Sequence, residues 1–303
     1  MRKADLVSRW ARMDPASRRE VQAWLLGQGS RPQCVARTDE GRYDLRGFSF
    51  SGTYVVGDPN VTLGPLWESL DLRAALLDEL RLFGTRLKNC LLEGASCRGW
   101  RLWGVSVEDC GFGRADLSSA SLGSGDWAGG GSEWKRVDFR GARFDNARFG
   151  AAAIDSCRFG RLVKVVFEGC SITGSVFMGP LSDVIIDGRR AKPELSADFS
   201  DSIFCNSQII GYSLQRAILP QQNDLRLLRD YPGVVRASLD ALSNPTTPLA
   251  ERAAKILSWL VKSPGAEDSD WCFDISSFGA DSHDPLPAFL DELFSRSQSR
   301  RIG

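Results

Sequence analysis

The chain has 303 residues, with 38 basic and 38 acidic side chains, so its formal net charge is zero. This neutrality removes any general electrostatic argument for binding to nucleic acid or to a membrane surface. No run of about 18 apolar residues could form a transmembrane helix, and the first residues lead into an amphipathic segment rather than an apolar signal core. We therefore expect a cytoplasmic protein.

Residues 1–33 are predicted to form a helical cap. Leu6 and Trp10 recur at helical spacing, and Asp14-Pro15 is typical of the start of a second helix. The segment has seven basic and three acidic residues. A basic amphipathic segment suits either the solvated outer face of a cap or contact with nucleic acid or a membrane, and the two can coexist.

From Leu72 onward an apolar residue recurs at every fifth position, twelve times in succession. Neither the period of 3.6 of a helix nor the period of 2 of a strand produces this spacing. Most residues two positions before each member are small, which gives a second regular column. The members of the first column are Leu72, Leu77, Leu82, Leu87, Leu92, Cys97, Leu102, Val107, Phe112, Leu117, Leu122 and Trp127.

The repeat is predicted to span residues 34–220, with interruptions at 56–66, 128–133, 160–166 and 178–196. The second interruption is interpreted as a two-residue insertion between Trp127 and Trp134, and the third as a three-residue insertion between Phe159 and Phe167. The fourth is interpreted as either an irregular coil or a projecting loop. Trp100 falls on the column of small residues, so we expect a local bulge there.

The copy Ala115-Asp116-Leu117-Ser118-Ser119 resembles the motif A-(D/N)-L-x-x of the pentapeptide-repeat family. The resemblance implies a mainly β fold, a right-handed quadrilateral β-helix in which four five-residue sides form a coil of twenty residues. The central apolar residue and the small residue two before it would point inward, and the other three would point outward.

Residues twenty apart would then stack on the same face, about 4.8 Å apart. Outward residues at this spacing include opposite charges and one aromatic pair, which cross-strand stacking favours. The predicted pairs are Arg73 with Glu93, Asp78 with Arg98, Lys88 with Glu108, and Phe83 with Trp103.

Residues 221–303 change to a helical period and are predicted to form an α-helical region. Residues 223–229 are interpreted as a short turn, and Asp268-Ser269-Asp270 as a polar linker. The helices could cap the rod, form a small separate domain or mediate a homodimer.

No motif indicates catalysis, a metal or another cofactor. Most of the eight cysteines lie on the inward columns and no C-x-x-C pair occurs, so we interpret them as core residues in a reducing compartment. His283 is the single histidine, and neither G-x-S-x-G nor a phosphate-binding loop is present. We therefore do not expect an enzyme.

Three surface features are candidate binding sites. The first is an aromatic and arginine patch on two neighbouring coils, Arg81, Phe83, Arg101 and Trp103. The second is a basic patch, Arg136, Arg140, Arg143, Arg148, Arg158 and Arg161. The third is a charged projecting loop, Asp187, Arg189, Arg190 and Lys192.

A rod of stacked coils has a fixed surface without a cleft, so we expect a non-catalytic scaffold that binds a protein partner. The resemblance implies an alternative, because the family includes acidic DNA mimics that bind DNA gyrase and protect it from toxins or quinolones. Residues 64–220 hold 19 basic and 19 acidic side chains, so such mimicry would need a local acidic stripe. A third hypothesis, a host- or membrane-directed effector, rests on the basic N-terminus alone. Direct binding of nucleic acid is not expected.

Overall fold

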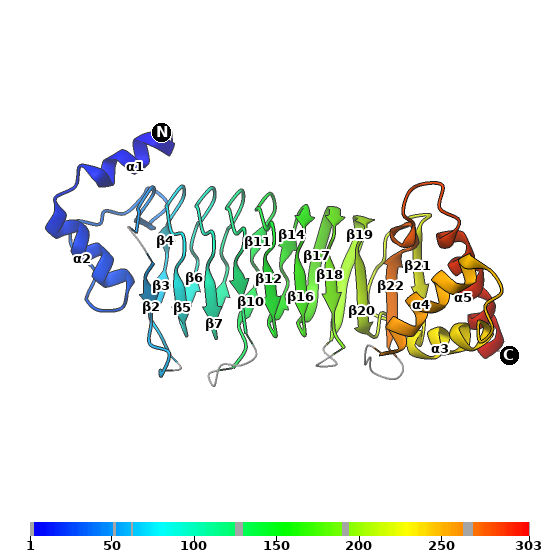
Figure 1. Cartoon of the computed structure of the whole chain (residues 1–303). Helices are drawn as coiled ribbons and strands as arrows, with labels where there is room; N and C mark the ends of the chain where they lie inside the picture. Colours follow the sequence, from blue (N-terminus) through cyan, green and yellow to red (C-terminus); the bar gives the residue numbers. More distant parts are fainter. Residues whose placement is uncertain are drawn as a thin grey trace.

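The protein is a rod of stacked coils with helices at both ends (Figure 1), seen in a computed structural model that describes residues 3–50, 53–61, 63–124, 130–189, 194–262 and 269–302. Two long parallel sheets form adjacent sides of the rod. Face 1 consists of β2 (Val55–Val56), β5 (Arg81–Phe83), β7 (Arg101–Trp103), β9 (Ser121–Leu122), β12 (Arg148–Gly150), β16 (Val166–Glu168), β18 (Ile185–Asp187) and β20 (Gln208–Tyr212).

Face 2 follows face 1 along the chain in each coil. It consists of β3 (Leu66–Glu68), β6 (Arg86–Lys88), β8 (Ser106–Glu108), β10 (Glu133–Lys135), β13 (Ala153–Asp155) and the beginning of β17 (Ser171–Ser182). Face 3 contains β1 (Tyr43–Asp44), β4 (Leu70–Asp71), β11 (Asp138–Phe139), β14 (Arg158–Phe159) and the middle of β17. Isolated bridges, β15 (Leu162–Val163) and the end of β17 form the fourth side, and β19 (Leu195–Cys205) continues beside β17.

The pairing register confirms a coil of twenty residues in the first sustained run. On face 1, Leu82 pairs with Leu102 and Leu102 with Leu122, and on face 2 Leu87 pairs with Val107. The paired central residues are almost completely buried, because each side of the coil turns its central residue inward. The predicted right-handed quadrilateral β-helix with helical ends is therefore confirmed.

The second residue after a central position forms the corner of the coil. Its φ is positive, for example 52° at Asn89 and at Asp109, in the left-handed region that Asn, Asp and Gly tolerate best. The repeat can therefore place many different residues on its sides, whereas its corners favour residues that accept this backbone.

Trp100 fits the core without the bulge that we expected. Its indole is fully buried and donates a hydrogen bond to the Leu77 carbonyl, and the next residue, Arg101, keeps unbroken register with Arg81. The central residue of the preceding side of the coil is Cys97, whose side chain is much smaller than that of the Leu usual at this position. A large residue on one column is thus accommodated beside a small one on the other.

Two predicted interruptions are wrong in length. Trp134 pairs with Val107, 27 residues earlier, so the second interruption adds seven residues rather than two; Trp127 lies outside the described residues. Phe149 pairs with Phe167, 18 residues later, so the third interruption is a deletion of two residues, and Leu162 is the buried central residue that the spacing missed.

Residues 178–187 form two sides of a regular coil rather than a projecting loop. β18 pairs with β16 on one side and with β20 on the other. The additional residues follow β18, because Ile186 pairs with Ile209, 23 residues later instead of 20.

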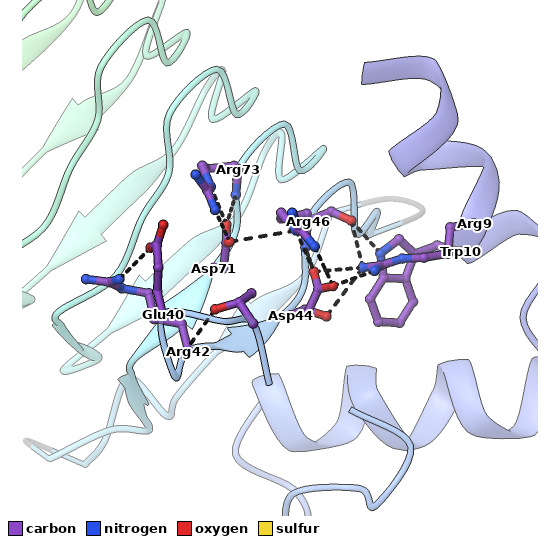
Figure 2. A network of polar contacts seen from close by, with 9 residues as sticks. Arg9, Trp10, Glu40, Arg42, Asp44, Arg46, Asp71 and Arg73 are labelled. Carbon is purple, nitrogen blue, oxygen red and sulfur yellow. Dashed lines mark hydrogen bonds and ion pairs between the residues drawn. The ribbon is translucent and has the colours of Figure 1, made fainter. Parts of the chain in front are cut away.

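Two helices, α1 (Lys3–Ala11) and α2 (Pro15–Leu25), close the N-terminal end. Arg9 binds the Asp44 carboxylate at 2.7 Å, and the Trp10 indole donates to the Arg46 carbonyl at 2.8 Å (Figure 2). Arg18 also donates to a backbone carbonyl of the rod. Basic side chains of this segment therefore help to dock the helices.

The C-terminal region is not purely helical, which corrects the prediction. It contains α3 (Tyr231–Ala241), α4 (Pro248–Lys262), the short helix η1 (Ile275–Phe278) and α5 (Leu286–Ile302), but also β21 (Leu225–Leu228) and β22 (Asp270–Asp274). β22, which includes part of the predicted linker, is wholly buried and pairs antiparallel with β20 and β21. Asp270 and Asp274 accept hydrogen bonds from the backbone amides of Leu214 and Asn206, which fasten β22 to the last coil.

Candidate functional site

The first predicted patch is assembled on face 1 by two neighbouring strands. β5 and β7 pair in parallel, so that Arg81 lies beside Arg101 and Phe83 beside Trp103. These residues flank the central Leu82 and Leu102, and the alternation of a strand turns them outward because the central residue points inward. The arginines are exposed and the aromatic rings are half-buried.

Phe83 and Trp103 stack face to face. Their ring centroids are 4.5 Å apart and their planes differ by 5°. In the two flanking strands, the residues that follow the paired Val56 and Leu122 are Gly57 and Gly123, which have no side chain. The two rings therefore stand as one rigid apolar block above a bare backbone.

Arg81 and Arg101 place like charges side by side. Among the described residues neither guanidinium has a carboxylate within ion-pair distance, and the neighbours in register are Val55 and Ser121. Like charges directly opposite each other on paired strands are destabilising. The rod maintains this arrangement without a compensating acid in its described part.

An exposed apolar segment extends the patch. Of the eight large hydrophobic residues that are exposed in the described structure, four lie within residues 55–66: Val55 (45% exposed), Val61 (46%), Leu63 (64%) and Leu66 (42%). Val55 lies on face 1 beside Arg81, and Gly64 donates to the Gly84 carbonyl next to Phe83. We call Val55, Val61, Leu63, Arg81, Phe83, Arg101 and Trp103 together the face 1 surface.

The sequence predicted four members of this surface and missed the other three. The period of five failed at 56–66, so nothing placed this segment beside β5. The available signal was the pair Val61 and Leu63, apolar side chains in a turn-rich segment where polar ones are usual.

The second predicted patch is not one surface. Its six arginines are distributed over all four sides of the rod, and several are already paired. Arg136 binds Glu108 and Asp109, Arg140 binds Asp138, Arg143 binds Asp145, and Arg148 binds Glu168. On face 3, Arg158 lies in register with Asp138, the carboxylate that Arg140 binds.

The third candidate is divided. Asp187 lies on β18 of the regular coil and its carboxylate binds Arg189 at 2.7 Å, whereas Arg190 and Lys192 lie outside the described residues.

Several aspartates that precede a central residue are bound by an arginine that follows it, whereas Asp116 and Asp198 accept hydrogen bonds from a serine at that position. In Asp71-Leu72-Arg73 the buried carboxylate accepts from the Arg73 side chain at 2.9 and 2.6 Å and from its backbone amide at 3.2 Å (Figure 2). The same pattern occurs at Asp44 with Arg46 and at Asp138 with Arg140. Asp187 follows the central Ile186 instead, and it binds Arg189 in the same way. These carboxylates are neutralised within the repeat, so they do not form the acidic stripe that a DNA mimic needs.

The predicted ladder is confirmed in part. Phe83 stacks on Trp103, and Lys88 lies 3.9 Å from Glu108. Arg73 instead pairs with Asp71, and Asp78 accepts from the Arg98 backbone amide and the Ser96 hydroxyl. Burial raises the pKa of Glu93, whose Oε2 has no hydrogen-bond partner.

The described residues contain no cluster that could hold a metal ion. Six cysteines are buried, and burial raises the pKa of the Cys157, Cys170 and Cys272 thiols to about 12. The backbone amide of His283, in an exposed loop, donates to Asp281. Among the described helices, none is both long and apolar enough to cross a bilayer.

Comparison with known proteins gives no matching family model and no matching curated protein. Among solved structures, a trypsin-treated form of QnrB1, a plasmid-mediated fluoroquinolone resistance protein, matches with 16% identity and a TM-score of 0.30, over 57% of this chain and 89% of that one.

Two further solved structures are described as pentapeptide repeat proteins. HetL, involved in heterocyst differentiation regulation in the cyanobacterium Nostoc sp. strain PCC 7120, has 15% identity and a TM-score of 0.17, over 58% of this chain and 83% of that one. A protein of the Arabidopsis thaliana thylakoid lumen has 19% identity and a TM-score of 0.16, over 65% and 77%. Similarity this low does not indicate a function, and the fold is shown by the stacked coils of the structure itself.

Proposed function

We propose that this pentapeptide-repeat protein is a non-catalytic scaffold that binds a protein partner through the face 1 surface. The observation that carries the proposal is the concentration of exposed apolar residues at 55–66 beside a rigid aromatic stack and two arginines. Aromatic and arginine side chains with adjacent apolar contacts are enriched at the energetic centre of protein interfaces.

The construction of the rod supports this role. The aromatic block stands on strands whose central residues are fully buried, so its position is fixed before binding and little conformational entropy is lost on association. The ends of the rod are covered by α1 and α2 and by β22, which leaves a long lateral face as the available surface (Figure 1).

The proposal is tested by affinity capture from the source cell with three forms of the full-length protein. The Phe83→Ala/Trp103→Ala double variant removes the stack. The Lys88→Ala/Glu108→Ala variant is the matched control, because it alters the same two coils on face 2. We expect at least one protein to be captured by wild type and control but at least tenfold less by the stack variant.

Equal capture by all three forms would contradict the proposal. Circular dichroism and thermal melting of each variant exclude loss of fold as the cause of any difference.

A further inference from the structure

We propose that the partner presents an acidic polypeptide segment to the face 1 surface, with carboxylates that bind Arg81 and Arg101 and an apolar side chain that packs against Phe83 and Trp103. This inference rests on the proposed function and specifies the chemistry of the partner.

The strongest observation is the contrast between two sides of the same coils. On face 2, the outward residues in register alternate in sign from coil to coil over five strands: Glu68, Lys88, Glu108, Lys135 and Asp155. On face 1, the corresponding strands of the same two coils place Arg81 directly beside Arg101. The rod therefore balances charge between coils on one side and leaves two positive charges together on the next.

Other arginines of face 1 are neutralised within the chain. Arg148 pairs with Glu168 in the next coil, and Arg189, just after β18, pairs with Asp187. Within the described residues, Arg81 and Arg101 have no comparable acid, and a carboxylate supplied by a partner would remove their mutual repulsion. Guanidinium and carboxylate groups form strong, often bidentate, hydrogen bonds, so two carboxylates about 5 Å apart on a partner strand or helix would match the pair.

The apolar surroundings favour a polypeptide over a nucleic acid, although both could bring negative charge. Val55 is an exposed aliphatic residue in register with Arg81, and the exposed Leu63 precedes Gly64, which donates to the Gly84 carbonyl at the end of β5. Such residues suit an apolar side chain rather than a sugar–phosphate backbone. Phe83 and Trp103 are also stacked on each other, so no base can insert between them. Closure of apolar groups around the arginines would exclude water and strengthen the ion pairs.

A peptide display library of unbiased sequence, selected on the full-length protein, tests the inference. We expect the selected peptides to contain at least two acidic residues and one large apolar residue. In fluorescence anisotropy, their affinity should fall at least tenfold for Arg81→Glu/Arg101→Glu, and it should be unchanged for the control Lys88→Glu on face 2. Replacement of the acidic peptide residues by lysine should restore binding to the charge-reversed variant.

Peptides without acidic residues, or equal affinity of wild type and Arg81→Glu/Arg101→Glu, would overturn the inference. So would tight binding of a labelled oligouridylate that requires Arg81 and Arg101, which would assign the surface to nucleic acid. If the charge-reversed variant fails to fold, Arg81→Gln/Arg101→Gln replaces it. Loss of binding in Phe83→Ala/Trp103→Ala but not in the arginine variants would leave the proposed function standing and remove only the acidic partner.

Discussion

The contacts of individual side chains in this rod depend on residues nearby in the sequence as much as on the stacking of coils. Arg73 could have met Glu93 in the next coil, but the carboxylate two residues earlier is closer and accepts a bidentate pair. The Oε2 atom of Glu93 has no hydrogen-bond partner, and the Glu93 side chain lies over Gly111 and Gly113, which have no side chains. The local Asp-x-Arg contact therefore takes precedence over the contact between coils.

Thiol accessibility tests the assignment of the cysteines to the core. Cys34 and Cys205 are exposed and the other six are buried, and a buried thiol with a raised pKa is both shielded and protonated at neutral pH. We expect two of the eight thiols to react rapidly with Ellman's reagent in the native protein and all eight in denaturant. Rapid native reaction of more than two would show that the described core is open.

The accommodation of Trp100 predicts a large cost of truncation. Trp100→Ala would leave a cavity beside the small Cys97 and remove the hydrogen bond to Leu77, so we expect a loss of about 3–5 kcal/mol in the free energy of unfolding. Trp259, which is 65% exposed, is the matched control, and its replacement by Ala should change stability by about 0.5 kcal/mol or less. Urea unfolding measures both, and equal losses would contradict the packing described.

At the scale of elements, the Asp44 carboxylate is one of the groups that dock α1 on the rod. Burial raises the pKa of Asp44, but hydrogen bonds from Arg46 and Arg9 outweigh this effect and hold the pKa well below its ordinary value. An acid whose pKa is lowered by folding stabilises the folded state above its unfolded pKa, and that stabilisation is lost as the pH falls below about 4.

Asp44→Asn should therefore reduce stability by about 1.5–3 kcal/mol at pH 7, since the lost hydrogen bonds involve charged groups. The difference from wild type should shrink as the pH falls below about 4. Glu40→Gln is the control, because Glu40 is largely exposed where it pairs with Arg42. A difference between Asp44→Asn and wild type that stays constant down to pH 2 would argue against this salt bridge.

The sequence predicted the elements that follow from the spacing of apolar residues. It did not predict the elements whose position depends on hydrogen bonding between distant strands. The inward columns follow from the period of five, and the stack of Phe83 on Trp103 follows from the twenty-residue coil that the family resemblance implies. Trp127 and Trp134 fit an apolar column of the sequence equally well, and only the pairing of β10 with β8 shows that Trp134 lies in register with Val107. β22 could not be predicted, because five residues with an aspartate at each end become a strand only through distant partners. Val61 and Leu63 were missed because the period fails in their segment.

At the scale of the whole molecule, the buried core and the surface proposed for binding are separate parts of the rod. The core is a continuous apolar column closed by α1 and α2 at one end and by β22 at the other. Much of the outer surface is balanced by local charge pairs, whereas the face 1 surface combines exposed apolar groups with like charges. We propose that this surface, rather than another side of the rod, binds the partner.

Site-specific photo-crosslinking tests that claim most directly. A benzoylphenylalanine is placed either at Ser121, which lies in register with Arg101 on face 1, or at Ser106, which lies on β8 of face 2. Both substitutions replace outward serines and leave the proposed contact residues unchanged. We predict that irradiation in the source cell yields a covalent protein adduct from position 121 and little or none from position 106. Adducts from position 106 alone would contradict binding of the partner by the face 1 surface.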